Sequence, residues 1–168
     1  TEDNTTTPGK KILNFCNSIG HKLIKEVELE IGGQLIDKHY SEWLEIWSEL
    51  TLPAEKDSGY EQMVGKSDFR DERSVPTSGD TLFVPLQFFF CRNPGLALPL
   101  IAMQYHEVKL TFNFGSKSEC ILSGTQVDVE SDVNKADKIS PELWVDYVYL
   151  DTDERRRFAQ VQHNMLID

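Results

Sequence analysis

The sequence predicts an all-β fold, an antiparallel jelly-roll sandwich that carries short helical insertions. Residues 22–31 alternate apolar and acidic side chains and lead into Gly32-Gly33, as expected of a strand that turns back in a hairpin. Residues 82–91 (LFVPLQFFFC) are almost wholly apolar, and residues 143–150 (LWVDYVYL) have the aromatic and β-branched content of a strand. Hairpin-linked strands at uneven spacing exclude the repeating strand–helix–strand pattern of a parallel sheet.

The predicted hairpin rests on two signals. Its first strand places apolar side chains on one face and glutamates on the other: Leu23, Val27, Leu29 and Ile31 against Glu26, Glu28 and Glu30. The two glycines supply the positive φ angles that a two-residue turn demands, and residues 34–38 return. Further strands are expected at 13–16 and 104–114, with weaker ones near Ile121 and at 127–129.

Residues 82–91 carry the strongest packing signal. Gln87 is their single polar side chain, so both faces of an extended segment would be apolar. Such a strand must be covered on both sides, and in a chain this polar elsewhere the outer cover is another domain or subunit. The segment therefore indicates assembly rather than catalysis.

A short helix is predicted over 42–50, with Ser41 as its N-cap and Pro53 after its end. Its apolar stripe is interpreted as a lid over one end of the β core or as a contact surface, and consists of Trp43, Ile46, Trp47 and Leu50. Residues 54–65 are expected to add a helical turn, and residues 66–80 a charged loop.

A last helix is predicted after Asp151 or Thr152. Asp151 and Glu154 have the spacing of a capping box, in which the first side chain accepts a hydrogen bond from the backbone three residues on. The apolar stripe of this helix would be formed by Phe158, Val161 and Met165.

The composition argues against several functions. The 168 residues suffice for one domain with a core, and the net charge is −11. A protein that binds phosphate backbones needs a basic face, so no direct nucleic-acid contact is expected. No apolar run reaches the roughly 18–20 residues that span a bilayer, so membrane insertion is not expected. Because the sequence opens at Thr1 and residues 1–10 are polar, we expect a loop or cut end there.

No catalytic, cofactor-binding or metal-binding residues are predicted. The histidines lack metal-ligand spacing and are expected to be structural: His21, His39, His106 and His163. Three widely spaced cysteines are expected to be small buried hydrophobic residues in a reducing compartment: Cys16, Cys91 and Cys120.

Three short motifs have simple structural interpretations. Gly32-Gly33-Gln34 matches the catalytic tripeptide of peptide-chain release factors, but its flanking alternation favours a hairpin turn. Asp151 and its acidic neighbours lack the glycine and third ligand of a calcium loop, and helix capping explains them. The arginines 155–157 fan around a helix, which favours salt bridges or a subunit contact over phosphate binding.

Four blocks of sequence resemble the major capsid protein of nucleocytoplasmic large DNA viruses, such as phycodnaviruses, iridoviruses and mimivirus relatives. They occur in the family's order: 27–40 (VELEIGGQLIDKHY), 43–51 (WLEIWSELT), 83–106 (FVPLQFFFCRNPGLALPLIAMQYH) and 143–160 (LWVDYVYLDTDERRRFAQ). The stretches CRNPGLALPLIA and YLDTDERRRFAQ are long and unusual, which makes the resemblance specific.

The resemblance implies two consecutive jelly rolls per polypeptide, with three copies in a pseudo-hexameric capsomer that tiles an icosahedral virion shell. Residues 1–168 then form a partial N-terminal jelly-roll domain, the later strands of the first of the two barrels. Residues 153–168 form an exit helix or linker towards the second. The implied partners are copies of the chain (a homotrimer), neighbouring capsomers and minor capsid proteins, and the implied assembly site is the cytoplasm of the infected cell.

Two alternatives from other classes remain open at this point. A cellular jelly-roll binding module, for example for carbohydrate, would need a concave face with exposed aromatic side chains and paired polar groups. A jelly-roll metalloenzyme of the cupin type would need clustered histidines on adjacent strands.

Overall fold

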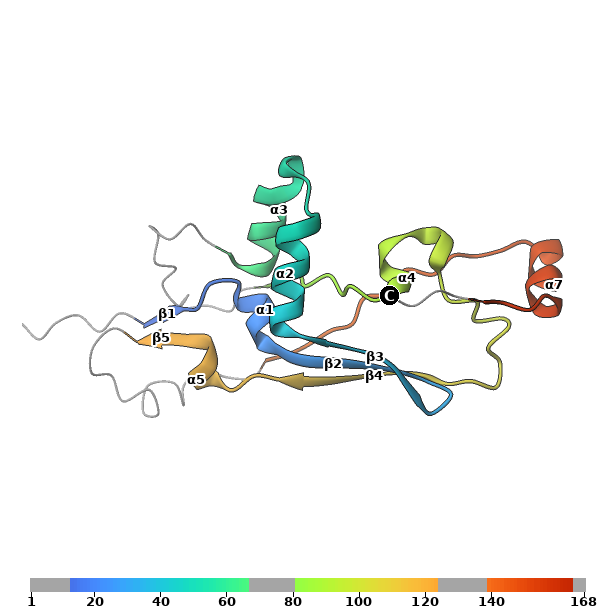
Figure 1. The fold of residues 1–168 in the computed structure, drawn as a ribbon, viewed down its shortest axis with the longest axis horizontal. Helices are drawn as coiled ribbons and strands as arrows, with labels where there is room; N and C mark the ends of the chain where they lie inside the picture. The colour runs from blue at the N-terminus through green and yellow to red at the C-terminus, as the bar shows by residue number, and fades with distance from the viewer. Residues whose placement is uncertain (1–12, 67–80, 124–138, 165–168) are drawn as a thin grey trace, which may run out of the picture.

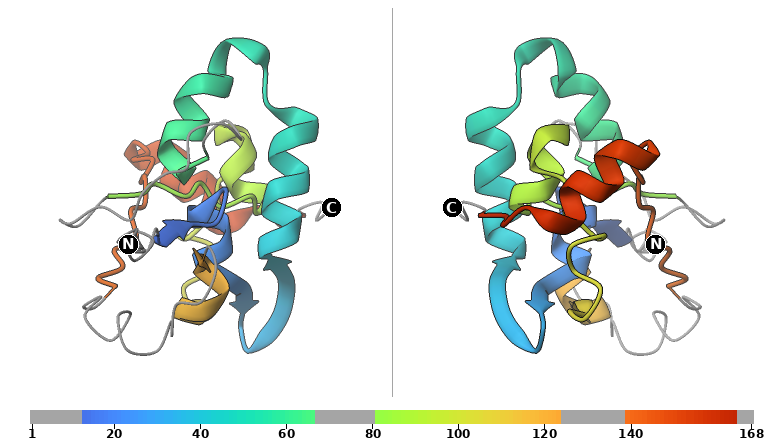
Figure 2. Two further views of the ribbon diagram at one scale, coloured as in Figure 1. Left: turned by 90° about the vertical axis from the view of Figure 1, so that its left-hand side faces the viewer. Right: turned by 90° about the vertical axis from the view of Figure 1, so that its right-hand side faces the viewer.

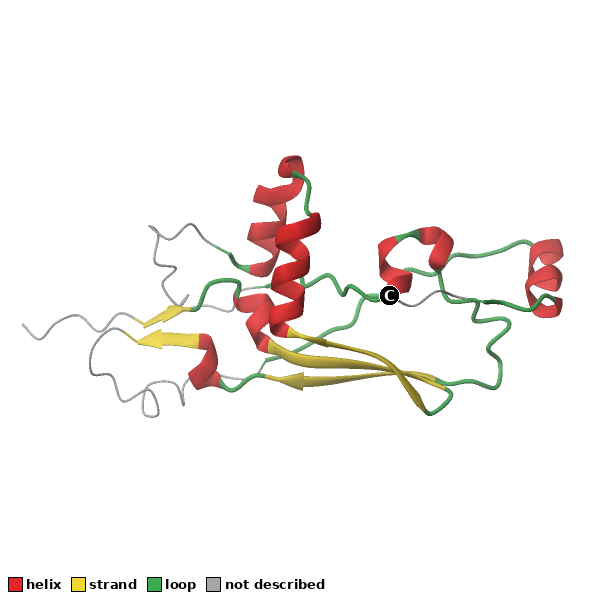
Figure 3. Cartoon of the chain, viewed as in Figure 1, coloured by secondary structure: helices red, strands yellow, loops and turns green. Residues whose placement is uncertain are grey.

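The computed structural model describes residues 13–66, 81–123 and 139–164. Its described strands pair antiparallel in two small sheets, one of order β3-β2-β4 and one of order β1-β5 (Figures 1 and 3). The strands are β1 (Leu13–Phe15), β2 (Ile24–Ile31), β3 (Gln34–Tyr40), β4 (Val108–Phe114) and β5 (Ile121–Ser123). The helices are α1 (Ile19–Leu23), α2 (Ser41–Thr51), α3 (Ala54–Val64), α4 (Phe89–Arg92), α5 (Lys117–Cys120) and α7 (Thr152–Gln160), with a 3-10 turn η1 (Pro94–Leu96).

The predicted hairpin is confirmed as β2 and β3. Gly32 and Gly33 have φ angles of 60° and 81°, the left-handed conformation that their turn requires. A bulge between Leu29 and Glu30 shifts the register, so that Leu29 faces Asp37 while Glu30 faces Leu35. The alternation of β2 also holds, because Val27 and Leu29 are fully buried whereas the glutamates point to the other face.

The third strand of this sheet, β4, begins later than predicted. Residues 104–107 belong to turns and irregular backbone, and pairing with β2 starts at Val108, which faces Ile31. The short strands β1 and β5 occur where strands were expected at 13–16 and near Ile121, whereas the strand expected at 127–129 lies outside the described residues.

The predicted strand over 82–91 is wrong. Residues 81–88 have no strand partner, and Phe89–Arg92 form the short helix α4. Pro85 lacks the N–H that a central strand must donate, which disfavours a ladder here. The segment instead covers the apolar face of β2: Phe88 and Phe89 are buried against Val27 and Leu29.

Only one side of that segment is dry in the described chain. Phe88 is fully buried, but Phe83 is 53% exposed. The backbone N–H of Phe83 donates to the carbonyl oxygen of Met63 at 2.9 Å, which ties the segment to the end of α3. The outer side of the segment is thus uncovered within the described residues, and its expected cover by another domain or subunit stays a prediction.

Helices α2 and α3 form a helical hairpin that projects away from the β2–β3 strands (Figure 2). The predicted helix after residue 41 is confirmed, but Tyr40 is its N-cap and no side chain caps it. The predicted helical turn at 54–65 is a full helix, α3, that ends at Gly65 in the left-handed conformation. Helix α1, on which this hairpin packs, was not predicted from the sequence.

The predicted strand over 143–150 is also not formed, because residues 139–150 have no regular secondary structure. The helix that follows is confirmed as α7. The Asp151 carboxylate accepts a hydrogen bond from the Glu154 N–H at 2.9 Å, the predicted capping contact. Val161 already lies past the end of this helix and Met165 outside the described residues, as do residues 1–10 and most of the predicted loop 66–80.

Candidate functional site

Two exposed apolar surfaces stand out on the described chain. The first, here called the α2 outer face, consists of Trp43, Ile46 and Leu50. The second, here called the C-terminal strip, consists of Leu143, Trp144, Val145, Tyr147, Val148 and Tyr149. Contiguous apolar surface of this kind marks sites where other protein binds.

The α2 outer face distinguishes between the two interpretations of its helix. The buried side of α2 is formed by Ser41, Leu44 and Ser48, so the predicted apolar stripe points outward. Ile46 is 51% exposed and Leu50 is 78% exposed. Of the two interpretations of this stripe, a lid or a contact surface, the exposure favours the contact surface.

Aromatic contacts hold one edge of this face in place. The Trp43 and Trp47 ring centroids lie 5.6 Å apart, and the Arg92 guanidinium lies 4.1 Å from the Trp47 ring. Stacking of a guanidinium on an indole is favourable and fixes the ring. The contact joins α2 to α4, so the edge is stiff before any partner binds.

The C-terminal strip is exposed on both of its sides. Trp144 is 82% exposed and Tyr149 is 92% exposed, although they fall on opposite faces of an extended segment. The Trp144 indole N–H donates to Glu142, a contact within the segment itself. A segment with strand composition and two uncovered apolar faces is suited to being enclosed by other protein.

The outer face of the three-stranded sheet is polar and internally neutralised. Lys38 Nζ lies 2.7 Å from Glu26 and 2.8 Å from Glu28, and Lys109 Nζ lies 3.1 Å from Glu30. Hydrogen bonds from Lys38 and Asn113 lower the pKa of Glu26. Because cross-strand pairs offset its charge, this face stabilises the sheet and is not a strong charged binding site.

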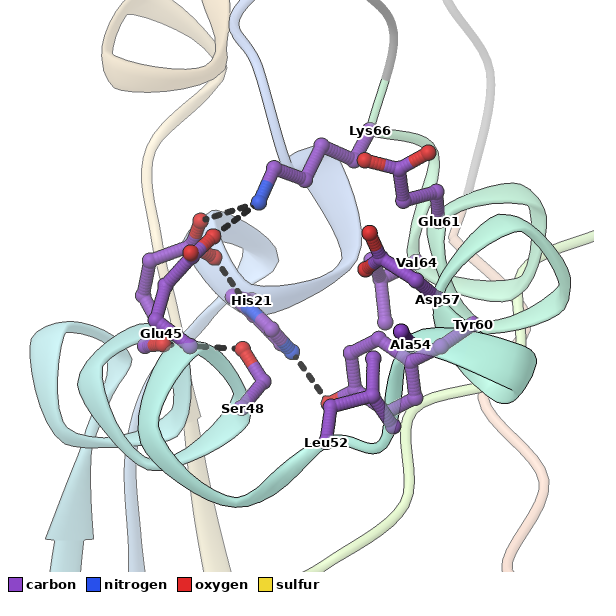
Figure 4. Close-up of a pocket in the computed structure, with 11 residues that line it drawn as sticks. His21, Glu45, Ser48, Leu52, Ala54, Asp57, Tyr60, Glu61, Val64 and Lys66 are labelled. Atoms are coloured by element: carbon purple, nitrogen blue, oxygen red, sulfur yellow. Dashed lines mark hydrogen bonds and ion pairs between the residues drawn. The ribbon is translucent and has the colours of Figure 1, made fainter.

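A polar hollow of about 210 Å³ lies between α1, α2 and α3 (Figure 4). The buried His21 sits at its centre, with Nδ1 2.5 Å from a Glu45 carboxylate oxygen and Nε2 2.8 Å from the Tyr60 hydroxyl. Lys66 pairs with Glu45 and Glu49 across the rim. Since both nitrogens of His21 are occupied, the network fastens three helices together and leaves the imidazole no free nitrogen.

The other histidines are also held by the structure. His39 is buried, with Nε2 2.9 Å from Asp37, and burial lowers its pKa. His106 packs beside Gly32, and His163 lies 2.8 Å from the Phe158 carbonyl oxygen. Within residues 13–66, 81–123 and 139–164, no group of three or more His, Cys, Asp or Glu side chains is placed to hold a metal ion.

The remaining motifs have structural roles, with one correction. Cys120 is buried as expected, but Cys91 is exposed. Arg156 lies 4.0 Å from Asp153, one turn away on α7. Among the helices that the structure describes, none has the length and apolar content needed to cross a membrane.

The hollow does not meet the requirement of the carbohydrate-binding alternative, a concave face with exposed aromatic side chains. Its one aromatic residue, Tyr60, is half-buried and hydrogen-bonded to His21. The exposed aromatic residues Trp144 and Tyr149 lie on an extended segment. The exposed apolar surfaces of the described residues favour contact with other protein over carbohydrate binding.

The chain belongs to the major capsid protein family of large DNA viruses. Residues 2–151 match the family described as "Major capsid protein N-terminus". The chain is 54% identical to the major capsid protein of Pyramimonas orientalis virus, over 89% of this chain and 36% of that protein. It is 44% identical to capsid protein 1 of Acanthamoeba polyphaga mimivirus, over 92% of this chain and 27% of that protein.

A solved structure agrees with the sequence relatives. The quasi-atomic structure of the PBCV-1 virus capsid matches 94% of this chain and 38% of its own chain, with 38% identity and a TM-score of 0.75. The chain thus spans about a third of the length of the relatives it matches. The family resemblance is confirmed, and the relatives that the chain matches are themselves named as capsid proteins.

Sequence reasoning found the right family but misjudged how its surfaces are exposed. It selected the tryptophan helix and the aromatic run 143–150, but expected the run to lie within a sheet. A half-buried strand would place polar residues regularly on one face. This run has a single charged residue, Asp146, and so lacks that alternation, which could have signalled that the run is not part of a half-buried sheet.

Proposed function

We propose that this chain is the jelly-roll part of a coat subunit that assembles in threes into pseudo-hexameric capsomers of an icosahedral capsid. In this proposal residues 1–168 supply later strands of the first of two barrels, and residues 153–168 lead towards the second. The partners are copies of the same chain, neighbouring capsomers and minor capsid proteins. The subunit contacts neither nucleic acid nor membrane directly, and it assembles in the host cytoplasm.

The C-terminal strip is the observation that carries the proposal. A strip of strand composition with both faces uncovered is what a barrel strand looks like when its neighbours are missing. Its enclosure would bury six large apolar side chains at roughly 1.5–3 kcal/mol each. A free-standing subunit would leave them in water, whereas a completed barrel wall inside a capsomer covers them.

Membership of the capsid family supports the same function. The relatives are named for capsids, and their sequences align along most of this chain. The net charge of −11 fits a subunit that must stay dissolved until specific contacts bring copies together.

Sedimentation of the full chain tests the three-copy assembly. We expect a species with three times the chain mass that dissociates when Trp144→Ser and Val148→Ser are introduced together. The matched control Tyr105→Ser removes an aromatic ring that is 94% exposed and should leave the assembly intact. A wild-type chain that stays monomeric at every concentration would refute the proposal.

Composition of purified particles tests the role in the virion. The chain should be the most abundant protein in particles from infected cells. Its absence from particles, with the chain remaining in the soluble cell fraction, would contradict a coat function.

A further inference from the structure

We propose that the α2 outer face is the docking site for helix α7 of a second copy of this chain. The inference rests on the proposed function for its premise that copies meet, and it adds which surfaces meet.

The α2 outer face combines apolar and acidic side chains. Trp43, Ile46 and Leu50 lie opposite the buried side of the helix, and Glu42 and Glu49 lie along one border of the apolar stripe. Helix α2 carries no basic residue, and the exposed fractions of its Glu42 and Glu49 side chains are 71% and 58%. A binding partner must therefore offer apolar contact together with positive charge.

Helix α7 and the residue that follows it have that combination. Its three arginines are all exposed, and they are followed by Phe158 and the exposed Val161. Arg156 has only a 4.0 Å contact with Asp153, and within the part of the chain that the structure describes Arg155 and Arg157 form no ion pair. Lys38 and Lys109 of the sheet, in contrast, are neutralised by cross-strand glutamates.

The arrangement of the chain favours contact between copies. Figure 1 places α7 at the far right end, well apart from the α2–α3 hairpin. Two different surfaces on opposite parts of one subunit make a head-to-tail contact, which closes into a ring when the rotation allows. Because two copies of charge −11 repel each other, a contact needs local attraction of this kind to form.

The other charges of the α2–α3 hairpin also favour a positively charged partner. Helix α3 adds Glu55, Asp57 and Glu61 and a single base, Lys56. Lys66 is already engaged by Glu45 and Glu49, and Lys22 lies 4.0 Å from Glu42. The hairpin as a whole thus presents a net negative surface to an approaching arginine helix.

Charge reversal on α7 is the first arm of the test. In the full chain, Arg155→Glu with Arg157→Glu should raise the dissociation constant between copies about tenfold or more at moderate salt, measured by sedimentation equilibrium. The matched control, Lys25→Glu with Lys109→Glu, makes the same change of net charge at two positions of the sheet, outside both helices. It removes no predicted contact between copies and should raise the dissociation constant far less. Equal effects of the two variants would overturn the proposal.

Rescue is the second arm. Glu42→Arg with Glu49→Arg should weaken association by itself, while Glu45 still holds Lys66. Combined with the reversed α7, it should restore at least part of the lost affinity. Far-UV circular dichroism of each variant confirms that the helices are retained. A combination no better than either reversal alone would refute the pairing.

A third variant, without any change of charge, tests whether the apolar side chains of α2 contribute to association. Ile46→Ser with Leu50→Ser removes side chains that are already exposed, so folding should be unaffected while association weakens. If wild type forms three-copy assemblies that none of these variants disturbs, the pairing of α2 with α7 is wrong and the coat function stands. If wild type never associates, both fail.

Discussion

The imidazole of His39 stacks on the ring of Phe88, with ring centroids 4.5 Å apart and planes inclined by 20°. His39 lies one residue before the end of strand β3, whereas Phe88 ends the irregular segment that covers the sheet. Burial lowers the pKa of His39, although Asp37 opposes that shift. Burial thus disfavours the charged imidazolium, and the stack anchors the segment of residues 81–88 to the sheet.

Replacement of Phe88 by alanine should remove this contact and destabilise the chain. Its side chain is fully buried, so Phe88→Ala is expected to lower the free energy of unfolding by about 3–5 kcal/mol, as measured by denaturant titration. Phe83→Ala is the matched control, because Phe83 is 53% exposed and its loss should cost less than about 1 kcal/mol. Similar costs at the two positions would show that the segment does not pack on the sheet.

The turn glycines give a second prediction. At Gly32 a Cβ would lie 3.1 Å from His106 Nδ1 and the residue has φ +60°, so Gly32→Ala should cost about 1–3 kcal/mol. Gly59 lies within α3 with open space around it, and Gly59→Ala should instead stabilise by about 0.5–1 kcal/mol. Thermal unfolding of both variants distinguishes them by the sign of the change. A stabilised Gly32→Ala chain would contradict the strained turn.

The hairpin was predictable because all its determinants are local. Alternating side chains and two adjacent glycines lie within one short stretch, and no distant contact is needed to read them. The structure of residues 81–92 was not predictable, because an apolar run is compatible both with pairing in a sheet and with lying across its face. Phe88 covers Val27 only through a contact between residues distant in sequence, which no local pattern encodes.

The outward orientation of the apolar stripe of α2 could not be decided from the sequence for a different reason. An apolar stripe normally faces the core, yet this helix buries Ser41, Leu44 and Ser48. Its orientation follows the His21–Glu45 contact with α1, a helix that local sequence did not reveal. This exception is informative, because a helix that exposes its apolar stripe and buries its more polar side is typical of a surface that binds other protein.

Thiol reactivity should separate the three cysteines. Cys91 is exposed, whereas Cys120 is buried. Desolvation raises the pKa of both thiols, that of Cys120 to about 11. At neutral pH and low protein concentration, a small alkylating reagent should modify Cys91 first and Cys120 last, as followed by mass spectrometry. Cys91→Ser should abolish the fast phase, and denaturant should make all remaining thiols reactive. Fast modification of Cys120 in the folded chain would contradict its burial.

Glu45 should make the helical hairpin sensitive to acid. Although partial burial works in the opposite direction, hydrogen bonds from His21 and Ser18 lower the pKa of Glu45. A carboxyl whose pKa is lower in the folded state stabilises it above the unfolded value, about 4.3, and loses that contribution as the pH falls through the folded value. The ionised form is therefore the one that holds α1 against α2.

The variant Glu45→Gln tests this linkage. At pH 7 it should lower the free energy of unfolding by about 1–3 kcal/mol, because His21 loses a charged hydrogen-bond partner. The difference from wild type should shrink below about pH 4.3, where the wild-type carboxyl becomes protonated. Glu55→Gln, at an exposed position of α3, should match wild type at every pH in chemical denaturation. A Glu45→Gln deficit that stays constant down to pH 3 would show that shape, not charge, is what His21 requires of residue 45.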